Sequence, residues 1–159
     1  MEIRRARPGE EDAVYALYRR AACDEYSTWN DFYPGMEEIG GDMRADGLFV
    51  LTEGNMIIGT ASIVPENELD VLDCWQCHEG SREIARVAVD SAYRGRGYAL
   101  KMVNVLTEIL KEQRYRAVHL SVAVSNVPAL RTYKKAAFEN MGEAELYCSR
   151  RYYLMEKLI

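Results

Sequence analysis

The sequence lacks a long hydrophobic run. Its first twenty residues include charged side chains at Arg4, Arg5, Glu10, Glu11 and Asp12, so they contain no apolar signal-peptide region. No later segment reaches the length that a membrane-spanning helix needs. We therefore expect a cytoplasmic protein with no membrane partner.

Positive charge is also scarce. The chain has 20 Lys and Arg residues against 25 Asp and Glu residues, which gives a net charge of -5. A nucleic-acid-binding face needs a surplus of Lys and Arg gathered on one surface to neutralise phosphates. We expect no nucleic-acid partner, and the acidic balance suits a cationic or neutral substrate better.

Cysteine and histidine are few, and their arrangement argues against a metal or haem centre. The four cysteines are Cys23, Cys74, Cys77 and Cys148, and in a reducing compartment they are expected to be free thiols. Residues 74–78 have the spacing of a c-type haem attachment site, but that chemistry requires export. A zinc site would need His119, which is predicted on a distant strand, and a fourth ligand such as Cys148. We expect no metal.

The 159 residues, 48% of them hydrophobic, fit a single domain over residues 1–159. Apolar spacing and turn residues predict the following order: a strand over 2–5, a helix with Val14, Leu17, Tyr18 and Ala21 on one face, a shaped loop over 24–46, a hairpin over 48–64, a polar excursion over 65–81, a strand over 84–89, a helix over 99–110, a strand over 117–124, a helix ending near 135 and two strands within 138–159. This order predicts an α/β or α+β fold, with helices packed on a mixed sheet.

One stretch carries recognisable chemistry: Arg94-Gly95-Arg96-Gly97-Tyr98-Ala99, where a strand turns into a helix. Gly95 and Gly97 let the backbone approach a ligand without obstruction by a Cβ atom. The N-terminus of a helix has unpaired N–H donors and a positive dipole end, and two arginines add positive charge. The stretch therefore predicts a diphosphate-binding turn.

Two familiar diphosphate motifs do not match this turn. A dinucleotide fingerprint would require glycine where the chain has Leu100, and the turn lies late in the chain. A P-loop would end in Gly-Lys-Ser/Thr, whereas Tyr98 follows Gly97 here. Nicotinamide and ATP are therefore disfavoured as ligands.

The same residues resemble a known family, the GNAT acyltransferases, whose diphosphate loop has the form Arg/Gln-x-x-Gly-x-Gly/Ala. Arg94, Gly97 and Ala99 match that form. Residues 126–138 are similar to the family's Asn-x-x-Ala-x-x-x-Tyr-x-Lys-x-Gly-Phe segment. The departure is Ala137, where the family usually has glycine, and a positive φ there would be strained for alanine.

The resemblance implies acetyl-CoA as co-substrate and a GNAT-like sheet. That sheet is mixed and mostly antiparallel, with about seven strands, helices on both faces and a splay between the strands at 84–89 and 117–124. The resemblance also implies that backbone at 87–89 pairs with the pantetheine arm and that 94–99 cradle the diphosphate. The implied cofactor-binding residues are Val87, Ala88, Val89, Arg94, Gly95, Arg96, Gly97, Tyr98, Ala99 and Asn126.

Acyl transfer to an amine needs a base for the amine proton and profits from an acid for the departing thiolate. Tyr133 matches the family position of that acid, and the alternative is an ordinary helix residue. Glu83 lies where some relatives carry a catalytic Glu that acts through water, and the alternative is a solvated carboxylate at a strand end. Glu79 is the reserve candidate for the base.

The resulting hypothesis is an N-acetyltransferase that moves an acetyl group from acetyl-CoA to a primary amine of a small molecule or peptide, by direct attack in a ternary complex. The alternative is a non-catalytic acyl-CoA-binding module. Trp29, Phe32, Tyr33 and Trp75 either line an acceptor pocket or belong to the core. Acidic residues over 66–73 suit a cationic acceptor through steering or are simply solvated. Strands exposed in the tail would allow a homodimer.

Overall fold

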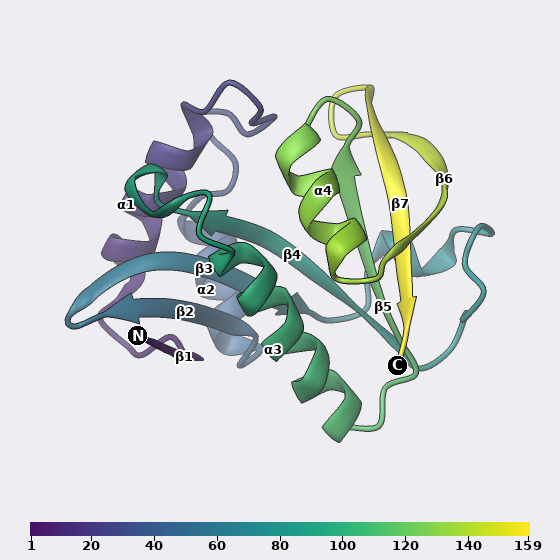
Figure 1. Cartoon of the computed structure of the whole chain (residues 1–159), viewed down its shortest axis with the longest axis horizontal. Coiled ribbons are helices and arrows are strands. Elements are labelled where there is room, and N and C mark those ends of the chain that lie inside the picture. The colour runs from purple at the N-terminus through teal and green to yellow at the C-terminus, as the bar shows by residue number, and fades with distance from the viewer.

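A computed structural model describes residues 1–159 and contains one seven-stranded sheet with the order β1-β2-β3-β4-β5-β7-β6 (Figure 1). The strands are β1 (Glu2–Arg5), β2 (Leu48–Glu53), β3 (Met56–Val64), β4 (Ser81–Val89), β5 (Ala117–Ala123), β6 (Glu139–Leu146) and β7 (Arg150–Leu158). All neighbouring pairs are antiparallel except β4 and β5, which run parallel. The predicted mixed, mostly antiparallel sheet of seven strands is confirmed.

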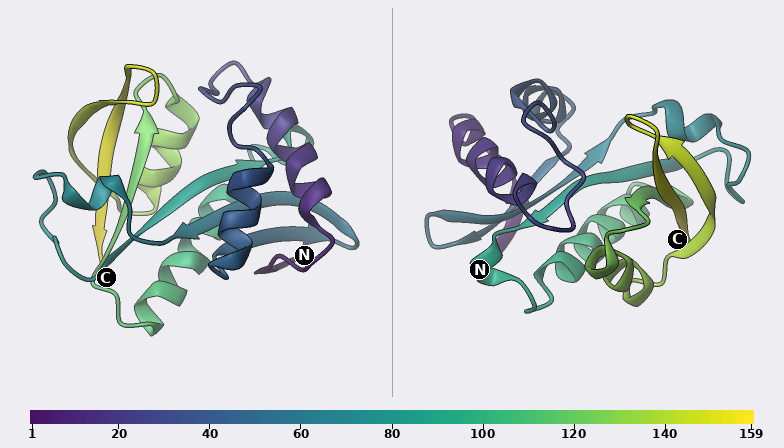
Figure 2. Two further views of the ribbon diagram at one scale, coloured as in Figure 1. Left: turned by 180° about the vertical axis from the view of Figure 1, so that it is seen from behind. Right: turned by 90° about the horizontal axis from the view of Figure 1, so that it is seen from above.

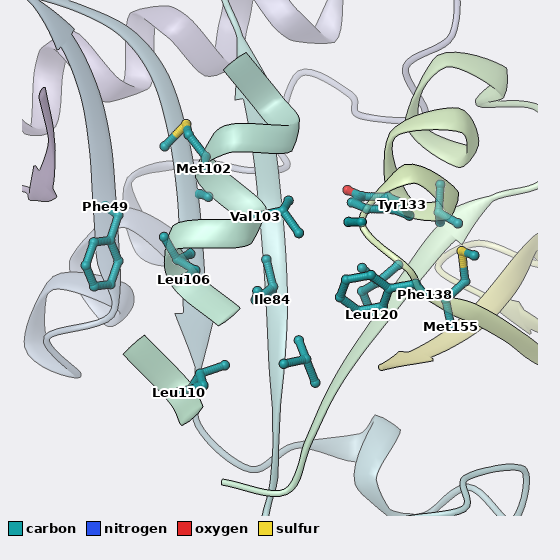
Figure 3. Packing of buried hydrophobic residues seen from close by; sticks show 14 of the residues in the cluster. Phe49, Ile84, Met102, Val103, Leu106, Leu110, Leu120, Tyr133, Phe138 and Met155 are labelled. Carbon is teal, nitrogen blue, oxygen red and sulfur yellow. The ribbon is translucent and has the colours of Figure 1, made fainter. Parts of the chain in front are cut away.

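Four α-helices cover the two faces of this sheet, as the view from above in Figure 2 shows. Helices α1 (Glu11–Ala22) and α2 (Met36–Arg44) lie on one face, and α3 (Tyr98–Glu112) and α4 (Val127–Lys135) lie on the other. A cluster of 16 buried residues fills the space between the sheet and α3 and α4 (Figure 3). A cluster of five buried residues packs under α1 and α2. The helices on both faces are as predicted.

Local sequence explains the two helices that flank the candidate site. In α3 the buried residues Met102, Val103, Leu106 and Leu110 recur at helical spacing and face the core. Helix α4 begins after Asn126, whose side chain accepts a hydrogen bond from the Ala129 N–H at 3.2 Å. Pro128 stands in the first turn, where no N–H is needed from it. Both helices lie where the sequence predicts them.

Helix α2 is a correction, because the sequence predicts a shaped loop with at most a broken helix over 24–46. Gly40 and Gly41 each disfavour a helix interior by about 1 kcal/mol relative to alanine. The nine-residue helix still forms, with Glu38 bonding back to the Gly35 N–H at 2.7 Å and Ile39 buried against α1 and the sheet. Packing of its apolar face outweighs the cost of the two glycines.

The sheet splits between β4 and β5. These strands pair only where Ser81, Arg82 and Glu83 face Ala117, Val118 and His119. Beyond this point they diverge, as the ribbon in Figure 1 shows. A bulge in β4 accompanies the split, because Arg86 has a φ of 51° and the register with β3 shifts there. The predicted splay is confirmed, and Glu83 is the last paired residue at its closed end.

The excursion between β3 and β4 is more ordered than its polar sequence suggests. It contains a short 3-10 helix, η1 (Glu68–Val71), whose Leu69 packs with Trp75 and Leu154. Trp75 is only 3% exposed, and its Nε1 donates to the Leu69 carbonyl at 2.6 Å. The prediction of a surface excursion is therefore wrong for Trp75, because this side chain covers the face of β5 and β7.

The end of the chain folds as the sequence predicts. The two predicted tail strands are confirmed as β6 and β7, and β6 forms one edge of the sheet. Ala137 has a φ of 66°, so this alanine does adopt the strained left-handed conformation expected where the family usually has glycine.

None of the helices has the length and apolar character required to cross a membrane.

Candidate active site

The predicted diphosphate turn joins η2 (Ser91–Tyr93) to α3 at the open end of the gap between β4 and β5. Gly95 and Gly97 have φ values of 74° and 78°, which are left-handed conformations that favour glycine. The six consecutive N–H groups from Gly95 to Leu100 donate no hydrogen bond within the protein, and the first bond of α3 joins the Lys101 N–H to the Gly97 carbonyl. The turn therefore has free donors for an anion.

The two arginines of this turn lie beside it and are already bonded. The Arg94 guanidinium pairs with Asp24 and donates to the Val89 carbonyl at 3.1 Å. The Arg96 guanidinium donates to the Ala92 carbonyl at 3.3 Å and lies over the Tyr93 ring. Each guanidinium still has N–H donors without a partner, so both arginines can add to the free backbone N–H groups of the turn.

Strand β4 presents a free backbone edge to the gap. The Asp90 N–H donates to the Ile58 carbonyl of β3, and Ala88 lies opposite Thr60 of β3. Because backbone groups alternate between the two edges of a strand, Val87 and Val89 direct theirs to the other edge, where β5 has diverged. Of the three predicted residues, Val87 and Val89 therefore face the gap, and Ala88 is bonded to β3.

Tyr133 projects from α4 on the opposite side of the gap. Its ring is buried in the large core cluster and packs edge-on against Phe138, with ring centroids 6.0 Å apart. The hydroxyl has no hydrogen-bond partner in the protein and points toward the side of α3 and β4 (Figure 3). Burial raises the pKa of Tyr133 to about 12, so the phenol keeps its proton at neutral pH.

Glu83 lies at the closed end of the gap and is not a solvated carboxylate. Its exposed fraction is 8%, and its Oε2 accepts a hydrogen bond from Asn67 Nδ2 at 2.5 Å. Burial, the largest cause, raises the pKa of Glu83 to about 7. The reserve candidate Glu79 is exposed before β4 begins, and its backbone carbonyl accepts hydrogen bonds from Arg116.

Beside Glu83 lies a buried ion pair that the sequence does not identify. Arg86, the bulge residue of β4, donates to both oxygens of Asp42 in α2 at 2.6 and 2.8 Å. Asp42 also accepts a hydrogen bond from Ser62 Oγ at 2.6 Å. Burial lowers the pKa of Arg86, but the hydrogen bonds and charge of Asp42 outweigh this and raise it. A charged residue within an apolar strand is the one sequence signal for this pair.

Tyrosines from distant segments of the chain contact one another close to Glu83. Arg86 Nη1 donates to the Tyr33 hydroxyl at 3.2 Å, and the Tyr33 ring stacks on Tyr147 at 6.4 Å between centroids. Tyr147 meets Tyr152 edge-on at 5.3 Å, and the Tyr152 hydroxyl bonds to Thr28 Oγ1 at 3.0 Å. Burial raises the pKa of Tyr147 to about 12, and the charge of Glu83 adds to that rise. The loop between α1 and α2 thus contacts the turn between β6 and β7.

Of the four aromatic residues expected either to line an acceptor pocket or to belong to the core, only Tyr33 belongs to this cluster. Trp29 packs edge-on against Tyr18 at 5.3 Å, and Phe32 is 90% exposed. Trp75 stacks on His119 at 3.9 Å between ring centroids. For Trp29 and Trp75 the packing interpretation is therefore the correct one.

The histidine prediction also needs correction, because His119 is not distant from residues 74–78. It stacks on Trp75, and its Nε2 bonds to Glu156 Oε2 at 2.8 Å. The four cysteines are unpaired, and no group of three or more His, Cys, Asp or Glu side chains is arranged to hold a metal ion. A surface hollow of about 510 Å³ lies near this segment and contains none of the predicted site residues except the reserve candidate Glu79.

Taken as geometry, the site is a split in a sheet with one free strand edge and an anion-binding helix N-terminus at the end of that strand. Such an arrangement fits an extended ligand that carries a phosphate group and pairs along the strand edge. The acetyltransferase (GNAT) family model matches residues 12–138. The chain belongs to this family, and the predicted resemblance is confirmed.

Sequence relatives agree with this assignment. An acetyltransferase of Pectobacterium atrosepticum is 31% identical over 143 residues, which are 89% of each chain. The mycothiol acetyltransferase of Acidothermus cellulolyticus is 28% identical over 156 residues, which are 92% of this chain and 47% of that protein. The chain thus spans less than half the length of the second relative.

Solved structures share the fold at lower identity. A GNAT-family acetyltransferase from Streptococcus agalactiae has a TM-score of 0.81 at 20% identity, covering 99% of this chain and 95% of that one. The yncA protein of Salmonella typhimurium, solved with its cofactor acetyl-CoA, has a TM-score of 0.77 at 17% identity, covering 99% and 93%. At these identities the comparison establishes the architecture.

Proposed function

We propose that the protein is an N-acetyltransferase that transfers the acetyl group of acetyl-CoA to a primary amine of a small molecule or peptide, in a ternary complex. The observation that supports this most directly is the gap that opens immediately after Glu83 and His119. One side of the gap has free N–H donors and a free strand edge, and its closed end has a buried carboxylate. Donor and acceptor groups can therefore meet at the split.

The donor would lie along β4. The free N–H groups of residues 95–100 would bind the diphosphate, and the backbone of Val87 and Val89 would pair with the pantetheine arm. This arrangement would place the thioester within the split between β4 and β5. The phenol of Tyr133, which has no partner in the protein, would face its sulfur.

The acceptor would approach from the face that carries Glu83, Tyr33 and Tyr147. Glu83 takes a proton from the ammonium form of the substrate, directly or through one water, because its pKa of about 7 suits proton transfer near neutral pH. The amine nitrogen then forms a bond to the acetyl carbon while the carbon–sulfur bond breaks. Tyr133 donates its proton to the departing thiolate, and the nitrogen of the new amide loses its second proton, which restores the Tyr133 phenol directly or through water. Glu83 releases the first proton to solvent. The products are the N-acetylamine and CoA, and no covalent enzyme intermediate is needed.

An amine panel with acetyl-CoA, monitored by released thiol, tests this proposal. We expect turnover with at least one amine, and Tyr133→Phe should lower kcat by about 10- to 100-fold with CoA affinity unchanged, because only the proton donor is lost. Tyr115→Phe is the matched control, since Tyr115 lies before β5 beside Arg82 and should leave kcat unchanged. CoA binding without turnover of any amine would instead support the non-catalytic acyl-CoA-binding alternative.

A further inference from the structure

Asn67 makes the one hydrogen bond that the Glu83 carboxylate accepts in the protein. Asn67 lies in the excursion between β3 and β4, directly before η1. Its Nδ2 donates to Glu83 Oε2 at 2.5 Å across a separation of 16 residues. Glu83 Oε1 has no partner in the protein. The two oxygens of the carboxylate are therefore inequivalent, with one occupied and one available.

Local bonds fix the orientation of the Asn67 amide. Its Oδ1 accepts the Leu69 N–H at 2.9 Å, so the other end of the amide must be the donor. Nδ2 gives its second hydrogen to the Pro65 carbonyl at 3.2 Å. The Asn67 N–H donates to Asp70 Oδ2 at 2.8 Å. Because every polar group of Asn67 is satisfied, its side chain is held in the orientation that reaches Glu83.

The excursion that carries Asn67 is itself fixed to the sheet. Leu69 is buried, and its carbonyl accepts a hydrogen bond from the Trp75 indole at 2.6 Å. Trp75 stacks on His119, the residue opposite Glu83 in the pairing of β4 and β5. His119 bonds to Glu156, which also accepts the N–H groups of residues 76 and 77 at 3.1 Å. The position of Asn67 relative to Glu83 is therefore set by buried contacts.

We propose that Asn67 is a positioning residue for the catalytic carboxylate: it occupies Glu83 Oε2 and leaves Oε1 directed to the acceptor amine. This inference rests on the proposed role of Glu83 as base. The donor also stabilises the ionised form of Glu83, against the burial that disfavours it. Asn67 thus sets both the direction of proton transfer and the pH at which the base becomes active.

Other charged and titratable groups face Glu83 from each neighbouring element. Arg86 lies on β4, Asp42 on α2 and Asp70 on η1, and all three act on the charge of Glu83. Tyr33 from the loop after α1 and Tyr147 from the turn after β6 also lie close enough for mutual charge effects, and His119 is opposite on β5. None of these groups donates a hydrogen bond to the Glu83 carboxylate, and Asn67 does.

The test replaces Asn67 by serine in the full chain, because Ser Oγ can keep the cap on the Leu69 N–H, whereas the serine side chain is one bond shorter than the Asn67 Nδ2 that reaches Glu83. The titration of Glu83 is followed by carboxyl 13C NMR, and kcat/KM is measured from pH 5.5 to 9. We expect the Glu83 midpoint and the acidic limb of the rate profile to move up by about one pH unit. At pH 6.5, kcat/KM should fall about tenfold, and the loss should shrink as pH rises.

Asn140→Ser is the matched control. Asn140 Oδ1 likewise accepts a local N–H, that of Gly142 at 3.0 Å, but it lies exposed on β6. An unchanged Glu83 midpoint in Asn67→Ser, or an equal loss of rate at every pH, would overturn the positioning role. If the wild type acetylates no amine, the proposed function fails, and the NMR titration still decides whether Asn67 controls Glu83.

Discussion

The turn at residues 94–99, proposed to bind the acetyl donor and called the donor turn below, and the proposed acceptor side around Glu83 and Arg86 flank the same gap but are built in different ways. In the donor turn the N–H groups of residues 95–100 are consecutive and have no partner in the protein. On the acceptor side, Glu83, Arg86 and Asp42 are each bonded to residues that are distant in the sequence. The N–H groups of the first region are free to bind a ligand. The side chains of the second region are held in place by hydrogen bonds to one another and to Asn67.

This difference has a physical basis. A diphosphate supplies its own charge, so a flexible-backbone turn at a helix N-terminus is sufficient to bind it. A carboxylate proposed to act as a base near neutral pH needs a raised pKa, which burial supplies for Glu83, and a buried charge needs nearby partners. The proposed acceptor side therefore depends on α2, the excursion over 65–80 and the turn after β6, which come together around β4 only in the folded chain.

The largest effect is expected at Glu83, the proposed base. Glu83→Gln keeps the shape and the Asn67 contact but removes proton acceptance, so kcat/KM should fall by about 10²- to 10⁴-fold. CoA affinity should be unchanged, because the donor turn lies at the other end of the gap from Glu83. In the wild type, kcat/KM should rise as pH increases through about 7, the pKa to which burial raises Glu83, since the base is active only when ionised.

Glu79→Gln is the control for this pair of candidates. Glu79 is an exposed acid four residues earlier, so its replacement should leave both the rate and the pH profile unchanged. Loss of activity in Glu79→Gln with normal activity in Glu83→Gln would transfer the role of base to the reserve candidate.

The next effect concerns the stability of the acceptor side. Asp42→Asn would leave the Arg86 charge buried without its partner and should lower the free energy of unfolding by about 3–5 kcal/mol. Asp46→Asn removes an exposed pair with Arg5 just beyond α2 and should cost less than about 1 kcal/mol. Urea denaturation measures the free energy of unfolding of both variants. Equal decreases would show that the buried ion pair stabilises the protein no more than the exposed one.

A smaller effect is expected in the donor turn. Gly97→Ala meets no atom in the protein, but its φ of 78° strains alanine by about 1–2 kcal/mol, and the added methyl obstructs the approach of a phosphate. We expect CoA affinity to fall about tenfold or more. Gly54→Ala, at φ 56° in the β2–β3 turn with equally open space, should show similar strain and normal CoA binding by calorimetry.

The smallest effect tests the residue that departs from the family pattern. Ala137→Gly relieves the left-handed strain at φ 66° and should stabilise the protein by about 0.5–1 kcal/mol after the entropic cost of glycine. Ala136→Gly, one residue earlier at φ -77° and buried, should instead destabilise it. If the melting temperature of Ala137→Gly is lower than that of the wild type, the positive φ at Ala137 does not strain the protein as proposed.

Particular residues show where sequence-based prediction succeeds. The stripe of α3, the Asn126 cap of α4 and the two tail strands depend on local spacing, and the structure has them as predicted. The splay was predicted through the family resemblance and is also present. Helix α2 was missed, because the glycines lower its local propensity and only the burial of Ile39 restores it.

The geometry of the donor turn was determined by the sequence alone, since the two glycines and the helix start that leave its N–H groups free lie within six consecutive residues. The surroundings of Glu83 were decided only by the tertiary structure. Asn67, Arg86, Tyr33 and Tyr147 have no common local pattern, and they meet because the packing of α2, the excursion and the β6–β7 turn brings them to one end of the gap. Burial at that meeting point, a property of no single segment, raises the pKa of Glu83.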